Sequence, residues 1–139
     1  MIKEPANVAR YLAAVGEATE APAAPRVAVR RAGTLYKMAL RHVRPLVQAL
    51  LKDHGLVPAD VDWVVPRQAS GPGLDMLPRL GFPAERTVNI IGQFGNCVAA
   101  SIPMALAHLA ASGRVKRGQR VLLLGTGAGF SVAGAVLRW

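Results

Sequence analysis

An apolar stretch at residues 95–113 constrains the fold of this chain more than any other part of the sequence. Its ends carry helix-boundary signals: Asn96 is a good N-cap, Pro103 lies early in the helix, and Gly113 follows the last turn. Between these ends, alanines and larger apolar side chains surround the helix axis and almost no face is polar. A helix that is apolar on all sides belongs in the centre of a large core. The sequence therefore predicts a central helix that is covered on more than one side.

This helix is a poor candidate for a membrane span. It is about 18 residues long, contains Pro103 and His108, and has no clear signal peptide before it. The whole chain has 139 residues, which is the usual size of one domain. Hydrophobic residues make up 52% of it, which is high for a small protein, so we expect another chain to cover part of its apolar surface.

The net charge of +9 predicts attraction to acidic partners such as nucleic acid, an acidic carrier protein or a phosphate-bearing cofactor. Nucleic acid is the least supported of these, because the few aromatic residues form no stacking pattern and no zinc-finger or RNA-recognition motif is present. The single cysteine, Cys97, excludes an internal disulfide and suits a reducing compartment, here expected to be the cytoplasm. The three histidines have no ligand-like spacing, so we expect no metal site.

Hydrophobic patterns divide the rest of the chain into strands and helices. Helical spacing of apolar residues predicts an amphipathic helix over 34–54, interrupted or bent near Pro45 and ended by Gly55. Its basic outer face is either a solvated surface or a docking surface. Strands are predicted at 7–15, 27–30, 62–66, 87–91, 121–124 and 131–139, a turn at 57–60, a broken helix at 74–80, and an Ala/Pro-rich loop at 17–26.

The glycine-rich loop at 125–130 superficially looks like a phosphate-binding turn. A dinucleotide-binding fingerprint would need a helix directly after it, whereas residues 132–137 have the pattern of a strand. We therefore reject a nucleotide site there. The glycines instead favour a tight hairpin whose backbone N–H groups approach a ligand closely.

Three motifs carry a resemblance to a known family. They are Arg67-Gln68-Ala69-Ser70 at the end of a strand, the turn Phe94-Gly95-Asn96-Cys97-Val98-Ala99-Ala100-Ser101, and the glycine-rich loop. In this order they resemble the C-terminal half of ketoacyl-acyl-carrier-protein synthase III enzymes, of the thiolase-like condensing superfamily. Their counterparts there are His-Gln-Ala-Asn, Tyr-Gly-Asn-Thr-Ser-Ala-Ala-Ser and a glycine-rich hairpin. The resemblance is clear over 57–139 and weaker over 33–55, and residues 1–32 are expected to lead into a single domain spanning 1–139.

The resemblance implies an α/β fold. Family members have two similar halves, with the central helices of both halves between two sheets. This chain would form the second half, a mixed sheet with a buried central helix. Its missing neighbour would come from another polypeptide or a second copy, through an interface on the order of 2,000 Å² or more.

The resemblance also implies a division of chemistry between the halves. The first half supplies a nucleophilic cysteine, and the second supplies a His and an Asn that stabilise the enolate formed from a malonyl thioester. Asn96 matches the family Asn, whereas Arg67 stands where the His is expected. Ser70 replaces an Asn that helps to position substrate, and Thr126 stands where many members carry a bulky aromatic. Coenzyme A or phosphopantetheine thioesters would be substrates, with no tightly bound cofactor.

Several site assignments remain open from sequence. Arg67 can hold a carboxylate or phosphate but stays charged and cannot act as a base, which argues against an ordinary decarboxylating condensation. Asn96 is either a catalytic donor or only a helix cap. Cys97 matches a family Thr and is either a reactive thiol favoured by the helix N-terminus or an inert small hydrophobe. Ala128 either offers an oxyanion N–H or only shapes the hairpin, and the proposed substrate-binding residues are Ser70, Thr126, Gly127, Ala128 and Gly129.

Three hypotheses follow for the whole chain. It is a half-length subunit that completes an acyltransferase site with a cysteine-bearing partner, with the basic helix docking an acidic acyl carrier protein. Alternatively, it is a non-catalytic partner that stabilises a catalytic homologue or shapes its pocket. The third possibility is that it is a fragment of a longer enzyme.

Overall fold

The computed structural model describes residues 32–127 and 131–139, so the strands predicted at 7–15 and 27–30 and the loop at 17–26 lie outside the described residues. The α-helices and strands are α2 (Ala32–Asp53), β1 (Trp63–Pro66), α3 (Gly71–Leu74), α4 (Ile91–Phe94), α5 (Ser101–Ala111), β2 (Arg120–Gly127) and β3 (Ser131–Arg138). Short 3-10 helices lie between them: η1 (Pro58–Asp60), η2 (Leu77–Leu80), η3 (Ala84–Arg86) and η4 (Val98–Ala100). The helix expected at 74–80 is indeed broken, and the turn expected at 57–60 forms η1.

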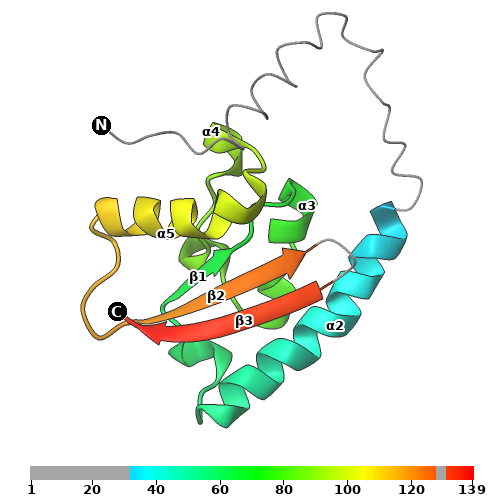
Figure 1. Ribbon diagram of the computed structural model, residues 1–139. Helices are drawn as coiled ribbons and strands as arrows, with labels where there is room; N and C mark the ends of the chain where they lie inside the picture. Colours follow the sequence, from blue (N-terminus) through cyan, green and yellow to red (C-terminus); the bar gives the residue numbers. More distant parts are fainter. Residues whose placement is uncertain (1–31, 128–130) are drawn as a thin grey trace, which may run out of the picture. The chain divides into compact units, whose positions relative to one another are not determined.

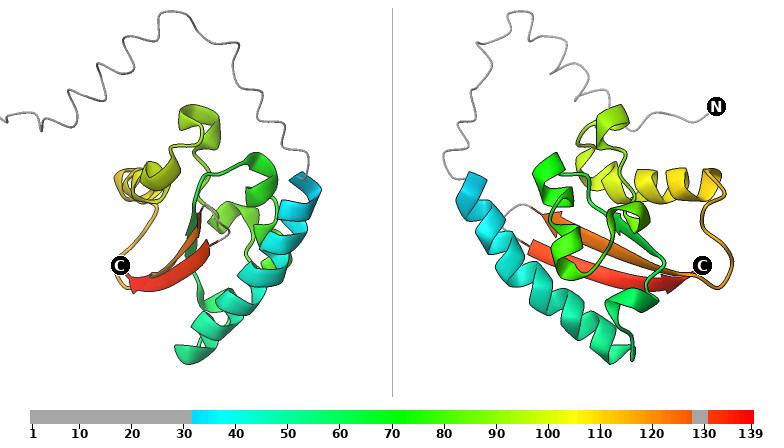
Figure 2. Two further views of the ribbon diagram at one scale, coloured as in Figure 1. Left: turned by 45° about the vertical axis from the view of Figure 1, so that its right-hand side comes forward. Right: turned by 180° about the vertical axis from the view of Figure 1, so that it is seen from behind.

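The three strands form one mixed sheet in the order β1-β2-β3. β1 and β2 are parallel, with Trp63 opposite Val121, and β3 is antiparallel to β2. Helices α2 and α5 lie on opposite faces of this sheet (Figures 1 and 2). Because side chains alternate between the two faces, Val64 packs into the core under α2 and the adjacent Val65 into the core under α5. Burial on both faces explains why β1 and the first half of β2 are continuous apolar runs.

Helix α2 confirms the predicted amphipathic helix. Val43, Val47 and Leu51 are buried at a spacing of four residues and pack into the core with Val64 and Leu122. The helix continues through Pro45, so an interruption there is wrong. It approaches β3 closely, since a Cβ atom at Gly134 would lie 3.1 Å from Leu50 Cδ2. After the helix, Gly55 adopts a φ of +64°, a conformation typical of glycine at a helix C-terminus.

Helix α5 differs from its prediction in two ways. It begins at Ser101 with Ala100 as N-cap, because the short helix η4 intervenes, so Asn96 does not cap it. It is also buried along only one row, formed by Ser101, Ala105 and Leu109. The opposite side is not covered by any residue that the structure describes, and Phe94 and Val98 just before the helix are 50% and 61% exposed. The predicted all-round burial therefore does not arise within these residues.

The prediction of a strand at 87–91 is wrong. Thr87 forms a single bridge with Val64, and α4 already begins at Ile91. The reason lies in the hydrogen bonds of this segment, because Ile90 N donates to the side chain of Gln68 (2.9 Å) and not to a neighbouring strand. In the part of the chain that the structure describes, no helix is long and apolar enough to cross a membrane.

Candidate functional site

The site lies at the carboxyl ends of the parallel strands β1 and β2. Ligands of α/β proteins commonly bind at this edge of a sheet. The motif at 67–70 directly follows β1, and Arg67 N extends the strand pairing by donating to Leu124 O (2.8 Å). The turn before α5 reaches the same edge, since Asn96 Nδ2 donates to Ala69 O (3.2 Å). Two motifs that lie far apart in the sequence are therefore in direct contact.

Gln68 connects these segments from inside the core. Its side chain is fully buried, and Nε2 donates to Pro66 O (2.9 Å) and Val88 O (3.0 Å) while Oε1 accepts from Ile90 N. The loop after β1 is thus fixed to the segment that leads into the Asn96 turn. Sequence reasoning quoted Gln68 within a motif but gave it no role. The available signal was an uncharged polar residue two positions after a buried apolar strand.

The Asn96 turn has an unusual backbone. Gly95 adopts φ +65° and ψ −158°, a region that is essentially restricted to glycine. Val98 has a φ of +49°, which is rare for a β-branched residue and costs on the order of 1–3 kcal/mol. Asn96 Oδ1 accepts from Val98 N (3.0 Å) and so stabilises this conformation. Asn96 is exposed, and one of the two Nδ2 protons remains after the bond to Ala69 O.

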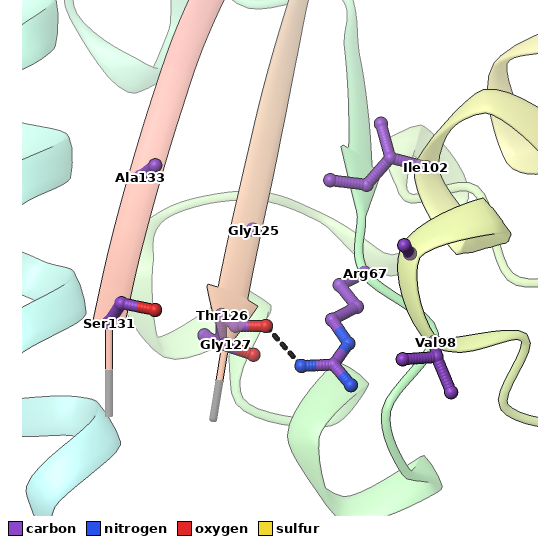
Figure 3. A pocket seen from close by; sticks show the side chains of 9 residues that line it. Arg67, Val98, Ile102, Gly125, Thr126, Gly127, Ser131 and Ala133 are labelled. Carbon is purple, nitrogen blue, oxygen red and sulfur yellow. Dashed lines mark hydrogen bonds between the residues drawn. The ribbon is translucent and has the colours of Figure 1, made fainter. Parts of the chain in front are cut away.

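Arg67 lies beside an open depression of about 370 Å³ (Figure 3). Its Nη1 donates to Thr126 O near the end of β2, so the two strand ends are joined across the site. The other lining residues come from η4, α5 and the facing ends of β2 and β3; they are Val98, Ala99, Ile102, Gly125, Thr126, Gly127, Ser131 and Ala133. Among the lining residues that the structure describes, Arg67 is the only charged one.

The other predicted site residues divide between this depression and its surroundings. Thr126 and Gly127 line it, while Ser70 lies in the exposed loop, where its Oγ accepts from Gly73 N (3.3 Å) and caps α3. Ala128 and Gly129 lie outside the described residues. Cys97 Sγ donates to Phe94 O (3.3 Å), a contact that uses the thiol proton. Within 32–127 and 131–139, no cluster of His, Cys, Asp or Glu has the composition of a metal site.

Comparison with known proteins agrees with this architecture. The family model for the C-terminal part of 3-oxoacyl-[acyl-carrier-protein (ACP)] synthase III matches residues 51–139. The chain belongs to the synthase III family. It is 40% identical over 106 residues to a β-ketoacyl-ACP synthase III of Deinococcus radiodurans, and 36% identical over 106 residues to that of Synechocystis. These matches cover 76% of this chain and 31% and 32% of the two relatives.

Solved structures of synthase III relatives share the fold. The 3-oxoacyl-ACP synthase III of Aquifex aeolicus matches with a TM-score of 0.75 at 33% identity, over 78% of this chain and 36% of that protein. OleA of Xanthomonas campestris matches with a TM-score of 0.73 at 28% identity, over 78% of this chain and 33% of that protein. The fold is therefore thiolase-like, and the chain spans about one third of the length of the relatives it matches.

Proposed function

We propose that this chain supplies the C-terminal part of an acyltransferase site of the synthase III type. The observation that carries the proposal is the bond between Asn96 Nδ2 and Ala69 O, which places the amide beside the Arg67 loop at the carboxyl ends of β1 and β2. The substrate is an acyl thioester of coenzyme A or of an acyl carrier protein, as the names of the relatives indicate for the carrier, and no tightly bound cofactor is needed. Asn96 acts by donating its remaining Nδ2 proton to the thioester carbonyl as negative charge develops there.

The nucleophilic cysteine comes from a partner half. Cys97 follows the Asn96 turn and matches a family Thr, so it is not the nucleophile. The uncovered side of α5 and the exposed side chains of Phe94 and Val98 offer an apolar surface for that partner. The partner is a complementary N-terminal half or a homologous condensing-enzyme chain, and the reducing cytoplasm is the compartment that suits a thiol nucleophile.

Native mass spectrometry of the protein purified from its own source tests the partnership. We expect a one-to-one complex with a cysteine-bearing condensing-enzyme half, and this complex should transfer acyl groups from acyl-coenzyme A. A stable monomer or a homodimer without such a partner would contradict the split site. A single longer polypeptide containing both halves would identify the chain as a fragment and leave the assignment of Asn96 intact.

The outer face of α2 is proposed to dock an acidic acyl carrier protein. Arg41, Arg44 and Lys52 are exposed on this helix. Charge reversal by Arg41→Glu is expected to raise KM for the carrier-linked substrate about three- to tenfold, because surface charges mainly steer association. KM for an acyl-pantetheine substrate, which lacks the acidic protein, should not change. Arg117→Glu, in an exposed turn after α5, is the matched control. Equal effects of the two variants on the carrier-linked substrate would disprove docking on α2.

A specific observation favours a second candidate, a non-catalytic partner of a catalytic homologue. Arg67 stands where the family resemblance expects His, and its guanidinium donates to Thr126 O and cannot accept a proton. Such a subunit would stabilise the homologue or shape its pocket. Substitution of Asn96, considered in the Discussion, separates the two candidates.

A further inference from the structure

The depression beside Arg67 is lined by two of the proposed substrate-binding residues, Thr126 and Gly127, and its chemistry narrows the class of ligand. Its volume of about 370 Å³ falls within the roughly 300–1,000 Å³ typical of small-molecule sites. We infer that it binds a carboxylate carried on a short aliphatic chain, with Arg67 as the anchor. If the carboxylate belongs to an acyl thioester, the inference rests on the proposed function and specifies the substrate class of that function. If the carboxylate belongs to a free acid, the inference does not depend on the proposed function.

The walls of the depression suit an aliphatic chain. Val98 and Ile102 lie on one side of Arg67, and the β2 and β3 residues Gly125 and Ala133 lie on the other (Figure 3). A Cβ atom at Gly127 would collide with Ser131 Oγ, so glycine at this position lets the Ser131 side chain lie against the end of β2, where both residues line the depression. Apolar walls with one convergent charged group are the usual composition of a site for an amphipathic small molecule.

Among the residues that the structure describes, the charge of Arg67 has no counterion. Its Nη1 donates to the neutral carbonyl of Thr126, Nε is buried without a hydrogen-bond partner, and no carboxylate of the described residues pairs with the guanidinium. Nη2 has no partner among these residues and carries two N–H donors. A guanidinium at the edge of an apolar surface is better satisfied by a carboxylate than by neutral groups, because the hydrogen bonds are then charge-assisted.

This pairing has a consequence for the reaction. A bond between guanidinium and carboxylate stabilises the bound acid, and loss of carbon dioxide removes the negative charge that is being stabilised. Interactions that are stronger in the ground state than in the transition state slow a reaction. The site is therefore suited to retain a terminal carboxylate and not to remove it, and the acyl thioesters it selects are those of dicarboxylic acids.

Titration calorimetry of the full chain with hexanoate and with its neutral analogue hexanamide tests the inference. Hexanoate is expected to bind about ten- to a hundredfold more tightly, the usual range for a charge-assisted pair. Arg67→Gln removes the positive charge and should abolish this preference. Arg79→Gln removes an equal charge from an exposed position in η2 and should keep the preference.

Measurements on the chain without substitutions test the inference even if the Arg67→Gln variant does not fold. Nuclear Overhauser contacts from the hexanoate methyl group to the methyl groups of Ile102 and Ala133 are expected. Equal binding of hexanoate and hexanamide, absence of these contacts, or a preference that survives in folded Arg67→Gln would each overturn the inference.

A second pair of probes identifies the source of the carboxylate. Adipoyl-pantetheine binding more tightly than hexanoyl-pantetheine would support dicarboxylic thioesters as ligands. Equal binding of the two, with hexanoate still preferred, would support a free acid and overturn the thioester part alone. Failure to find a partner half would contradict the proposed function but would leave the hexanoate result unchanged.

Discussion

Asn96→Ala is expected to lower kcat/KM for acyl transfer by about 10²–10³-fold in the complex with the cysteine-bearing half, the usual effect of removing one oxyanion donor. The Asn96 side chain donates from Nδ2 to Ala69 O and accepts at Oδ1 from Val98 N. These two hydrogen bonds hold the amide on both sides, and one Nδ2 proton remains for the substrate. The strained backbone at Val98 depends on the same side chain. Steady-state kinetics with a saturating acyl donor measure the effect.

Asn89→Ala is the matched control for the loss of a local turn. Asn89 Oδ1 accepts from Ile91 N (3.1 Å), the same two-residue pattern that Asn96 makes with Val98, but Asn89 makes no bond to the 67–70 loop. Its substitution should leave kcat/KM within about threefold of the original value, because loss of one exposed hydrogen bond costs little. Asn96→Asp keeps the acceptor for Val98 N and loses the donor. Full turnover in Asn96→Asp or Asn96→Ala would refute the catalytic role and favour a non-catalytic partner.

The parts of the fold that were predicted correctly are those with a local physical cause. Strands β1 and β2 are apolar runs buried on both faces, and α2 has a buried row with a four-residue repeat. Each pattern follows from its own residues, independent of the rest of the chain. The start of α5 was predicted wrongly because Asn96 is a good cap by type, whereas its two bonds go to Ala69 and Val98 in the preceding turn.

The remaining differences depend on contacts between distant segments. Residues 87–91 have strand-like composition, but the backbone N–H of Ile90 donates to the side chain of Gln68, about twenty positions earlier, and not to a neighbouring strand. No local pattern contains that information. The all-apolar character of α5 predicted burial on several sides, and only the row facing the sheet is buried here. The apolar residues around a helix indicate which of its faces are buried, but they do not indicate which segment covers each face.

The largest expected effect on stability comes from Gln68→Met. Methionine fills a similar volume, but the substitution removes the two donor bonds to Pro66 O and Val88 O and the acceptor of Ile90 N. Leaving a buried backbone group unsatisfied costs about 1–3 kcal/mol, so we expect the free energy of unfolding to fall by about 2–4 kcal/mol. Urea unfolding followed by tryptophan fluorescence measures this change.

Gln93→Met makes the same chemical change at an exposed position in α4 and should alter the free energy of unfolding by no more than about 0.5 kcal/mol. If both variants unfold at the same urea concentration, Gln68 does not hold the loops together.

The Gln68→Met variant also tests how stability and site geometry are connected. Gln68 touches no proposed substrate position, yet it fixes the loop that carries Arg67 and Ala69 to the segment leading into Asn96. Gln68→Met should therefore lower kcat even under conditions where the chain remains folded, and Gln93→Met should not.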